Sequence, residues 1–579
     1  MVLFREKIHT TKIKIYILFV LLLLPAFYAM GVAIDLEYSW LKKIAYLSVV
    51  LVLLFIPALF LKAKTYFLIE GIFNFFFFPI EMASLYLNKQ SVSVAFLQNL
   101  FHTDWHESTE LLMSLWPLCC IVIALWCFFF ILATRLDNVY LFNRRISKFI
   151  IIVGCILLVS GICTLGIMQK IVTPSKPTKQ VVIDSFCYTW TKLYKIYPYN
   201  LYINTCDIIK SQHMQRHMQR EADNFHFGIQ SLATNENTLF IFVIGEASRY
   251  DHWSINGYHR PTTPLLSKQT NIINYDSVFS QANLTRYSVP LILTRATAQH
   301  PEKAYQEKSL SEAFQEAGYK IGFLSMQPPS NLTTRVMHAS DYSFYNAHSF
   351  ATNDNYDMDL LQPLRTYIAD SMQMFILHTL GSHYRYEQRY PPEFAIYQPV
   401  MGNTFSKLNI IEQNKDLFIN AYDNSILYTD YFLNELITYV DSLDKEAVIL
   451  YMSDHGESLW DDERKLSLHG SYQITKYEYH VPFVIWYSNE YAAQHPEKIS
   501  VTVQNKTTPV SSDVVFYSLL DMAGIDDIVD STRSICSTSL ARMDTIWVHT
   551  GSGSSEKWGI PRPPTPLSTS ETPHGSLGD

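Results

Sequence analysis

The sequence predicts two parts of different fold class, an α-helical membrane domain with five transmembrane helices and an α/β catalytic domain. The first third of the 579-residue chain contains five apolar stretches, each close to the ~20 residues that a helix needs to cross a bilayer. From Leu239 onward, short apolar runs rich in β-branched and aromatic residues alternate with helical patterns, which is typical of α/β folds. A chain of this length also exceeds what one core can hold.

The apolar stretches define the expected membrane topology. Lysine and arginine concentrate before the first stretch, between the second and third, and between the fourth and fifth. The positive-inside rule places these three segments in the cytoplasm, so everything after the fifth stretch should lie outside it. The predicted spans are 13–32, 44–61, 66–87, 116–133 and 149–168.

Composition divides the chain into four regions. Residues 1–170 form the membrane domain, and 171–225, rich in Tyr, Lys and Trp, form an interfacial linker. Residues 226–545 form the catalytic domain, and the Gly, Ser and Pro mixture of 546–579 is expected to be disordered. A net charge of −8 without a basic patch argues against a nucleic-acid partner.

Polar residues follow the expected strands of the α/β domain directly. The run 239–244 ends at Gly245 and presents Glu246 at its carboxyl end, where ligands bind in open α/β sheets. A capping box, Ser309 with Glu312, opens a helix that stops near Gly318. The other expected elements are strands 319–324, 374–377, 447–452 and 480–487, a helix over 420–440 and a last helix over 512–522.

Four residues, three oxygen donors and one imidazole, could share one metal ion. Such a set suits zinc, although its oxygen content is also compatible with manganese or magnesium. One of the four is a threonine, and a hydroxyl becomes a good nucleophile only when a base or metal activates it. The four are Glu246, Thr285, Asp454 and His455, with Thr285 the candidate nucleophile.

Three histidines, His378, His383 and His469, are expected at the same rim. They could hold the non-bridging oxygens of a phosphoryl group, bind a second ion or protonate a leaving group. In the membrane part, Asn99, Thr103 and Glu107 recur every four residues, so a helix would present all three on one face. That face could receive a small cationic head group, or it could belong to a solvated interfacial helix.

These motifs resemble the phosphoethanolamine transferases of the inner membrane, a family that includes lipid A transferases and the mobile colistin-resistance enzymes. The resemblance implies an alkaline-phosphatase-like fold in the periplasm, with zinc at the four residues named above. It also implies that Thr285 becomes phosphorylated by the donor lipid, phosphatidylethanolamine, and that the acceptor is lipid A or another envelope glycan. Asn99, Thr103 and Glu107 match the family's donor head-group contacts, and the three histidines match its phosphate-side histidines. The matching segments are IGEASRYDHWSINGY, NLTRYSVP, LHTLGSHYRYEQRYPPEF, YDNSILYTDYF, YMSDHGESL and QNLFHTDWHESTELL.

The acceptor and two other functions stay open at this point. Lipid A members carry a Lys in a cysteine-flanked loop, whereas SMQPPSNLTTRVMHASDY has neither residue, so a core sugar or another glycan is an equal candidate acceptor. Phosphoglycerol transfer from phosphatidylglycerol would need the same metal and nucleophile, and a non-catalytic membrane sensor would need only the fold. A sulfatase is disfavoured, because the segment from Ser288 to Ile292 lacks the Arg of the sulfatase maturation motif.

Overall fold

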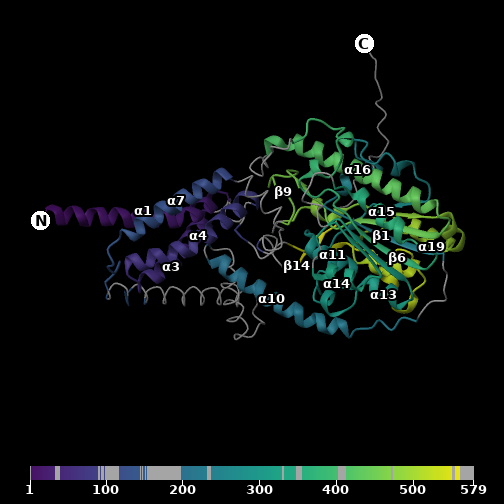
Figure 1. The fold of residues 1–579 in the computed structure, drawn as a ribbon, viewed down its shortest axis with the longest axis horizontal. Helices are drawn as coiled ribbons and strands as arrows, with labels where there is room; N and C mark the ends of the chain where they lie inside the picture. Colours follow the sequence, from purple (N-terminus) through teal and green to yellow (C-terminus); the bar gives the residue numbers. More distant parts are fainter. Residues whose placement is uncertain are drawn as a thin grey trace, which may run out of the picture.

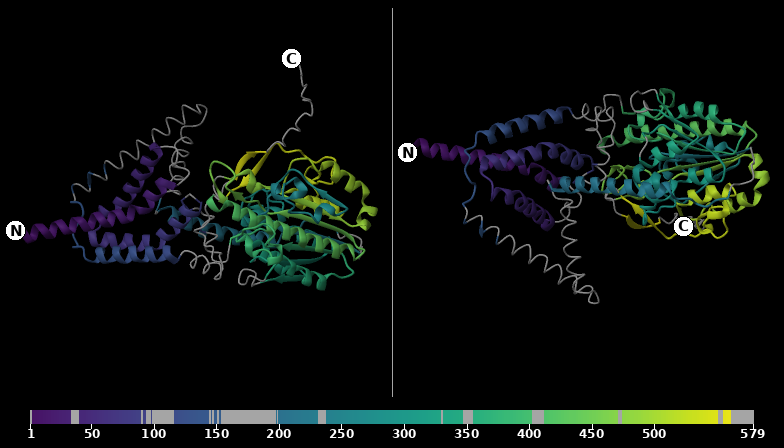
Figure 2. Two further views of the ribbon diagram at one scale, coloured as in Figure 1. Left: turned by 90° about the horizontal axis from the view of Figure 1, so that it is seen from above. Right: turned by 60° about the horizontal axis from the view of Figure 1, so that its bottom comes forward.

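The computed structural model has a helical part and an α/β part at opposite ends of an elongated molecule (Figure 1). Further views show the same separation, with helix α10 (Tyr199–Asp223) running from one part to the other (Figure 2). The structure describes residues 2–32, 40–88, 91–92, 97, 116–143, 145, 148–149, 152, 197, 199–230, 237–328, 331–346, 355–401, 412–470, 474–550 and 555–560.

Apolar helices make up the described helical part. They pack together through aromatic side chains such as Phe67 and Trp126, whose neighbours form one buried cluster. Large apolar side chains, among them Ile72, Ile121 and Phe128, nevertheless stay exposed on the outer surface, as expected of helices that face lipid rather than water. The helices are α1 (Val2–Val32), α3 (Trp40–Ala58), α4 (Ala63–Asn88) and α7 (Trp116–Thr134).

The described helices support membrane crossing only in part. By length and composition, Thr10–Val32 could span a bilayer, and Ala63–Asn74 with Phe77–Leu85 would be a second span if this pair, bent by 50°, counts as one. Val49–Ala58 and Cys120–Thr134 are apolar but shorter. The fifth predicted span, 149–168, lies almost entirely outside the described residues. Five membrane crossings therefore stay a prediction.

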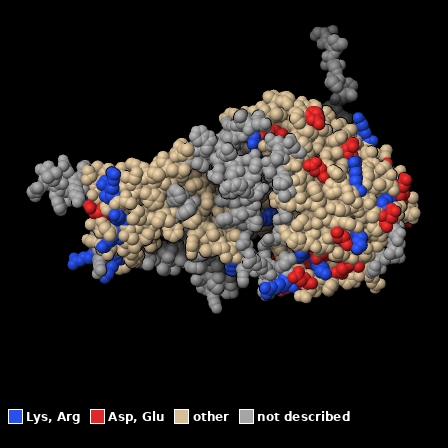
Figure 3. All heavy atoms as spheres, in the orientation of Figure 1, with Lys and Arg blue, Asp and Glu red and all other residues tan. Residues whose placement is uncertain are grey.

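Basic side chains gather at the end of the helical part that lies far from the α/β part (Figure 3). Within the helical part, the Lys14 ammonium donates to the carbonyl of Arg135 at 3.4 Å, and the Lys62 ammonium lies 6.0 Å from the centre of the Tyr140 ring. These residues come from all three segments that the positive-inside rule places in the cytoplasm, or from the turns beside them. The fold thus brings the three basic segments together.

Helix α10 is attached to both parts. Its Asn200 amide donates to Glu81 Oε2 of α4 at 2.7 Å. Further along the helix, α10 packs against α12 (Lys303–Gln306) of the α/β part. Just beyond its end, the Phe227 N–H donates to Glu316 Oε2 at 3.0 Å. The region predicted as an interfacial linker therefore contains a helix held at both ends.

A seven-stranded sheet forms the centre of the α/β part. Its strands are β1 (Thr238–Gly245), β2 (Ile272–Asn274), β4 (Lys320–Ser325), β5 (Tyr342–Tyr345), β6 (Gln373–His378), β7 (Glu446–Ser453) and β11 (Phe483–Tyr487). Their order is β2-β11-β7-β1-β6-β4-β5. The central strand β1 pairs in parallel with β7 and β6, whereas β11 runs antiparallel to β7. The carboxyl ends of β7, β1, β6 and β4 consequently meet at one edge.

One predicted strand, 480–487, is divided in the structure. Its first residues form β10 (His480–Val481), which pairs with β3 (Val278–Phe279) in a separate small sheet that also holds β12 (Val510–Ser511). Its remainder is β11 of the central sheet. Pro482 lies between the two strands, and because proline has no N–H to donate, it interrupts a hydrogen-bonded ladder.

Helices cover both faces of the sheet. The capping box predicted at Ser309 and Glu312 is present at the start of α13 (Leu310–Glu316), where the Ser309 N–H donates to Glu312 Oε2 at 2.8 Å. The short strands β8 (Ser458–Leu459) and β9 (Ser467–Leu468) pair with each other. The helices are α11 (Thr285–Leu293), α12, α13 (Leu310–Glu316), α14 (Asn331–Ala339), α15 (Leu361–Tyr367), α16 (Lys415–Asp441), α17 (Lys476–Tyr479), α18 (Asn489–Gln494), α19 (Pro496–Asn505) and α20 (Val514–Met522).

Two hydrophobic cores lie on the two faces of the sheet. Phe240 and Phe242 of β1 belong to the core that includes α13 and α20. Leu239 and Ile241 belong to the other core, which the long helix α16 covers. Successive β1 side chains enter the two cores in turn, because side chains of a strand point alternately to its two faces. Since both faces are buried, this run is apolar throughout.

The ordered chain extends past residue 546, where the sequence predicts that a disordered tail begins. β13 (Thr545–His549) pairs antiparallel with β14 (Ser555–Gly559). The hairpin is also attached to the domain, since the His549 N–H donates to the Gln281 carbonyl at 2.7 Å. The alternating residues Ile546 and Val548 are buried, so a short apolar alternation orders this segment although Gly and Ser follow it in the sequence. Residues 561–579 lie outside the described part.

Candidate active site

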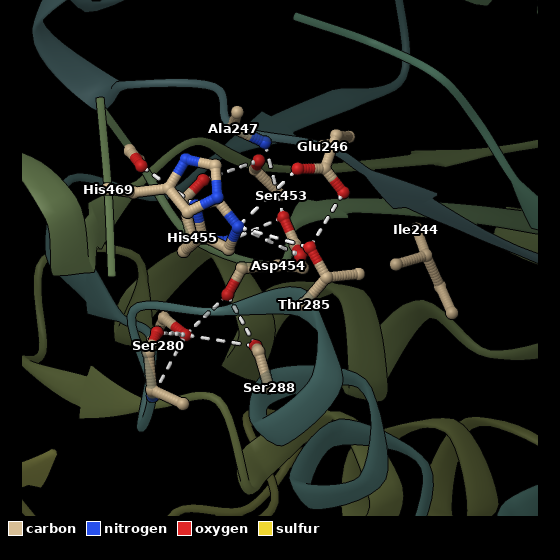
Figure 4. Close-up of polar contacts among 12 residues, drawn as sticks. Ile244, Glu246, Ala247, Ser280, Thr285, Ser288, Ser453, Asp454, His455 and His469 are labelled. Atoms are coloured by element: carbon tan, nitrogen blue, oxygen red, sulfur yellow. Dashed lines mark hydrogen bonds and ion pairs between the residues drawn. The ribbon is translucent and has the colours of Figure 1, made fainter. Parts of the chain in front are cut away.

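Four predicted residues come together at the carboxyl edge of the central sheet (Figure 4). Glu246 directly follows β1, and Asp454 with His455 directly follows the neighbouring strand β7. Thr285 is the first residue of α11. Their side chains point toward one another, so the site is built from three segments that are far apart in the sequence.

The two carboxylate oxygens of Glu246 have different environments. Oε2 accepts hydrogen bonds from Thr285 Oγ1 at 3.0 Å and from Gln327 Nε2 at 2.8 Å. Oε1 is buried without a hydrogen-bond partner among the described residues and lies 3.4 Å from His455 Nε2. Because a buried oxygen without a partner is costly, Oε1 is the atom of this carboxylate that is available to a ligand.

Asp454 shows the same division. Its Oδ1 accepts from the His455 N–H at 2.7 Å and from the Ala247 N–H at 3.2 Å. Its Oδ2 is likewise buried without a hydrogen-bond partner in the described part of the chain and lies 3.4 Å from His455 Nε2. Backbone donors therefore orient this carboxylate so that one oxygen faces the same point as Glu246.

His455 presents one nitrogen to this point. Its Nδ1 lies 2.8 Å from the Gly456 carbonyl, which can only accept, so Nδ1 carries the proton. Nε2 then has a free lone pair and lies 3.2 Å from Thr285 Oγ1. A partner on the far nitrogen that fixes the tautomer is the usual arrangement for a metal-binding histidine.

The electrostatics of the site favour a cation. Burial, and then the charge of Asp454, raise the pKa of Glu246 to about 7, and burial raises the pKa of Asp454 to about 7. Burial, and then the neighbouring His469, lower the pKa of His455 to about 4. Two buried acids beside a neutral imidazole repel each other when ionised, and a divalent cation would stabilise both carboxylates.

The donor set fits a zinc ion. Glu246, His455 and His469 offer ligand atoms that all lie within 4.8 Å of one another. The unpartnered oxygens of Glu246 and Asp454, the Nε2 of His455 and the hydroxyl of Thr285 give three oxygens and one nitrogen, a set of the kind that zinc accepts. His469 is a further nitrogen at the same place.

Two hydroxyls near the site differ in their availability. Thr285 is only partly buried, and at the start of a helix it lies where backbone N–H groups favour an anion such as phosphate. Ser288 is fully buried, and its hydroxyl donates to the Asp454 carbonyl at 2.5 Å and contacts Ser280 Oγ at 3.1 Å. Ser288 thus supports the backbone of Asp454, and Thr285 is the hydroxyl open to a substrate.

The remaining predicted residues have different positions. His469 lies over His455, with ring centres 4.1 Å apart, and its Nδ1 is 3.2 Å from Glu457 Oε1. His378, the last residue of β6, is buried with its Nε2 unpartnered among the described residues and its Nδ1 3.5 Å from Ser325 Oγ. His383 Nδ1 lies 2.6 Å from the Tyr384 carbonyl. Asn99, Thr103 and Glu107 lie outside the described residues.

Comparison with known proteins assigns the α/β part to a family. Residues 238–525 match the family model described as Sulfatase. This part of the chain is a sulfatase-family domain. The matched range begins with β1 and includes Glu246, Thr285, Asp454, His455 and His469.

The domain's relatives are named phosphoethanolamine transferases. Kdo(2)-lipid A phosphoethanolamine 7''-transferase of Escherichia coli (strain K12) is 30% identical over 277 residues, which cover 46% of this chain and 47% of that protein. Phosphoethanolamine transferase EptC of Escherichia coli O18:K1:H7 is 26% identical over 487 residues, 80% of each chain. The match thus spans about half the length of the first relative. These relatives confirm the predicted resemblance and the prediction of an enzyme.

Solved structures bear out the fold. The integral membrane protein lipooligosaccharide phosphoethanolamine transferase A (EptA) of Neisseria meningitidis superposes with a TM-score of 0.63 at 21% identity, covering 88% of this chain and 97% of that one. The C-terminal periplasmic domain of EptC from Escherichia coli, solved in complex with Zn, gives 0.50 at 26% identity over 56% of this chain and 92% of that one. The predicted sulfatase-like catalytic domain is therefore confirmed.

Sequence reasoning missed one residue of the site in this sulfatase-family domain. Gln327 follows β4 and donates from its Nε2 both to Glu246 Oε2 and to the Thr379 carbonyl, each at 2.8 Å. In the sequence, its segment stands out only for lacking a Lys and a Cys. The available signal was its position, because Ser325, Met326 and Gln327 follow a predicted strand whose carboxyl end lies at the ligand-binding edge.

Gly381 allows another loop to approach the site. Its φ is +48°, and a Cβ there would lie 2.9 Å from the backbone nitrogen and oxygen of Glu246. The next residue, Ser382, donates its N–H to the Glu246 carbonyl at 2.9 Å. A larger residue at 381 would be strained and would push the loop after β6 away from Glu246.

Proposed function

We propose that the chain transfers phosphoethanolamine from phosphatidylethanolamine to lipid A, a core sugar or another envelope glycan, at the periplasmic face of the inner membrane. The observation that carries the proposal is the environment of Thr285, whose hydroxyl donates to Glu246 Oε2 at 3.0 Å and lies 3.2 Å from His455 Nε2. The names of the relatives, which include a transferase of Kdo(2)-lipid A, support the group transferred and the class of acceptor.

Glu246, Thr285, Asp454 and His455 would hold one zinc ion, which when bound supplies a Lewis acid that favours the ionised form of a hydroxyl. The zinc complex of the EptC domain supports this choice of metal. His469, next to this set, would bind a second ion or the phosphate oxygens. Manganese stays compatible with so many oxygen donors.

Thr285 would act in two steps. In the first, its Oγ1 bonds to phosphorus and its proton passes to Glu246 Oε2. The bond between phosphorus and the diacylglycerol oxygen breaks, and that oxygen takes the proton from Glu246, so that diacylglycerol leaves as an alcohol. In the second, an acceptor oxygen bonds to the same phosphorus, the bond to Thr285 breaks, and the acceptor's proton passes through Glu246 to the Thr285 oxygen. The start of α11 and the imidazole of His469 would stabilise the charge on the non-bridging oxygens.

A trapped intermediate tests the proposal. Incubating the protein with donor vesicles and no acceptor should leave a phosphoethanolamine adduct on the peptide that contains Thr285, visible by intact-mass and peptide mass spectrometry. Thr285→Ala should form no adduct and lose several orders of magnitude in turnover, since it removes the whole covalent route. Thr285→Ser keeps a hydroxyl and should retain part of the activity.

The same experiment separates the alternatives. An adduct on Ser288, or near wild-type transfer by Thr285→Ala, would show that the nucleophile is another group. A phosphoglycerol adduct from phosphatidylglycerol vesicles would identify the other donor. Absence of both adducts from zinc-loaded protein would favour a non-catalytic membrane sensor.

A further inference from the structure

Arg286 directly follows the proposed nucleophile and has no function in the steps above. It is the second residue of α11, and its side chain is partly buried. Within the part of the chain that the structure describes, its Nη1 is buried without a hydrogen-bond partner. A buried donor that belongs to a charged group is expensive to leave unpaired, so this position calls for a partner that is not supplied by the described fold.

Two other buried or half-buried arginines of the domain are paired with carboxylates. Arg249 contacts Asp461 at 2.9 Å, and Arg295 contacts Glu307 at 2.7 Å. Arg286 has no ion pair of this kind among the described residues, although it lies in the same domain. The contrast indicates that its guanidinium is kept available for an anion from outside the protein.

The surroundings of Arg286 suit an anion. The groups that act on it electrostatically are the phenols of Tyr287 and Tyr305. No carboxylate of the described residues is among them. The Arg286 guanidinium therefore keeps a positive charge that these neighbours do not neutralise.

The position of Arg286 relates the site to the membrane part. Tyr305 belongs to α12, the helix that packs against both α11 and the linker helix α10. Arg286, which interacts with Tyr305, is thus a neighbour of the helix that contacts the connection to the membrane part. An anion carried by a membrane lipid or glycan would approach from this direction.

We propose that Arg286 binds a phosphate group of a membrane-borne substrate beside Thr285, and so helps to select anionic substrates. The proposal rests on the proposed function, since it concerns the same site. A guanidinium can form two parallel hydrogen bonds with a phosphate, and the start of α11 adds backbone N–H groups of the same polarity. The phosphate would come from the donor lipid or from a phosphorylated acceptor.

Three variants of the full-length, zinc-loaded protein in lipid nanodiscs test this role. Arg286→Gln removes the charge at similar length, and Arg286→Lys keeps it. Arg295→Gln is the matched control, because it removes an arginine whose partner is a carboxylate of the protein itself. The readouts are the affinity for inorganic phosphate by calorimetry, the rate of adduct formation from donor alone, the KM for a phosphorylated acceptor, and Tm.

We expect Arg286→Gln to weaken phosphate binding by about ten- to a hundredfold, the usual range for a charge-assisted hydrogen bond. Arg286→Lys should recover part of this loss, because an ammonium keeps the charge but not the paired N–H geometry. Tm should not fall in Arg286→Gln, because no partner is left unpaired, whereas Arg295→Gln should lower Tm by leaving Glu307 without its cation. Slower adduct formation would assign the phosphate to the donor, and a raised acceptor KM would assign it to the acceptor.

Unchanged phosphate affinity in Arg286→Gln would overturn the proposal. A loss that Arg286→Lys does not recover, together with a lower Tm, would also overturn it, because that pattern marks a structural residue. The phosphate titration needs no turnover. It therefore tests Arg286 even if the wild type forms no adduct and the proposed transferase reaction fails.

Discussion

In three of the four proposed metal ligands, hydrogen bonds occupy one atom of the side chain and leave the other facing the site. Glu246 Oε2 accepts from Gln327 and Thr285, which leaves Oε1 without a partner among the described residues. Backbone groups likewise bond to Asp454 Oδ1 and to His455 Nδ1, so Asp454 Oδ2 and His455 Nε2 face the site. The orientation of the proposed ligands is thus set before an ion binds, which reduces the free-energy cost of ordering them.

Gln327→Met tests this orientation. Methionine has a similar length but no N–H, so Glu246 Oε2 would lose one of its two hydrogen bonds and the carboxylate could turn. We expect zinc affinity to fall by about ten- to a hundredfold, the usual effect of removing such a supporting group. The measurement is competition with a chromophoric chelator.

Gln315→Met is the control for the Gln327 variant. Gln315 is exposed, and its amide donates to the Ala339 carbonyl at 3.1 Å, away from the site. Its zinc affinity should equal that of the wild type. Equal zinc affinity in both variants would show that Gln327 does not orient Glu246.

At the scale of elements, the C-terminal hairpin borders the segment that leads to Thr285. His549 of β13 bonds to the backbone of Gln281, which precedes Thr285 in the same segment, and its Nδ1 lies 2.9 Å from Ser555 Oγ of β14. The His549 and Tyr287 rings pack edge to face. Burial lowers the pKa of His549 to about 4, so the hairpin accommodates this residue as a neutral imidazole.

The stability of the protein should therefore depend on pH through His549. Its pKa is lower in the folded chain than in the unfolded one, so the unfolded chain binds the proton first as the pH falls. The contribution of neutral His549 to the free energy of unfolding is fully present above pH ~6.5. As the pH falls toward ~4, it is lost at about 1.4 kcal/mol per pH unit. Denaturant unfolding of wild type and His549→Phe between pH ~7 and ~4.5 measures it as the difference in slope.

If the free energy of unfolding depends on pH equally in the wild type and in His549→Phe, His549 is not the group responsible. Hydrogen exchange of residues 545–549, measured by mass spectrometry at neutral and at mildly acidic pH, is the local check. Faster exchange at acidic pH in the wild type, reduced in the variant, would locate the effect in the hairpin.

The sequence was informative where burial alone decides structure. β1, β4, β6 and β7 are apolar on both faces and are bounded by polar residues, so both the strands and the residues at their ends could be predicted. Elements whose structure depends on partners far away in the sequence could not be predicted. Gln327 matters because it reaches Glu246, 81 positions away, and β2, β3 and β14 are short strands whose pairing depends on partner strands rather than on their own pattern.

At the scale of the whole molecule, an apolar helical part with its basic residues at one end lies opposite the catalytic part (Figure 3). This arrangement supports a catalytic part outside the cytoplasm. A reporter that is active only after export, fused after residue 230, should be active in cells. The same fusion with a reporter that is active only in the cytoplasm should be silent, and the opposite pair of results would contradict the topology.

The attachment of α10 at both ends limits where the active site can work. Asn200 fixes the helix to α4, and its packing on α12 fixes it to the catalytic part, so Thr285 should stay at a constant height above the lipid. Substrates would then arrive by lateral diffusion in two dimensions, and turnover would follow the mole fraction of donor in the bilayer. Diluting phosphatidylethanolamine with phosphatidylcholine in nanodiscs or proteoliposomes should slow the reaction, while adding more donor vesicles in bulk should leave it unchanged.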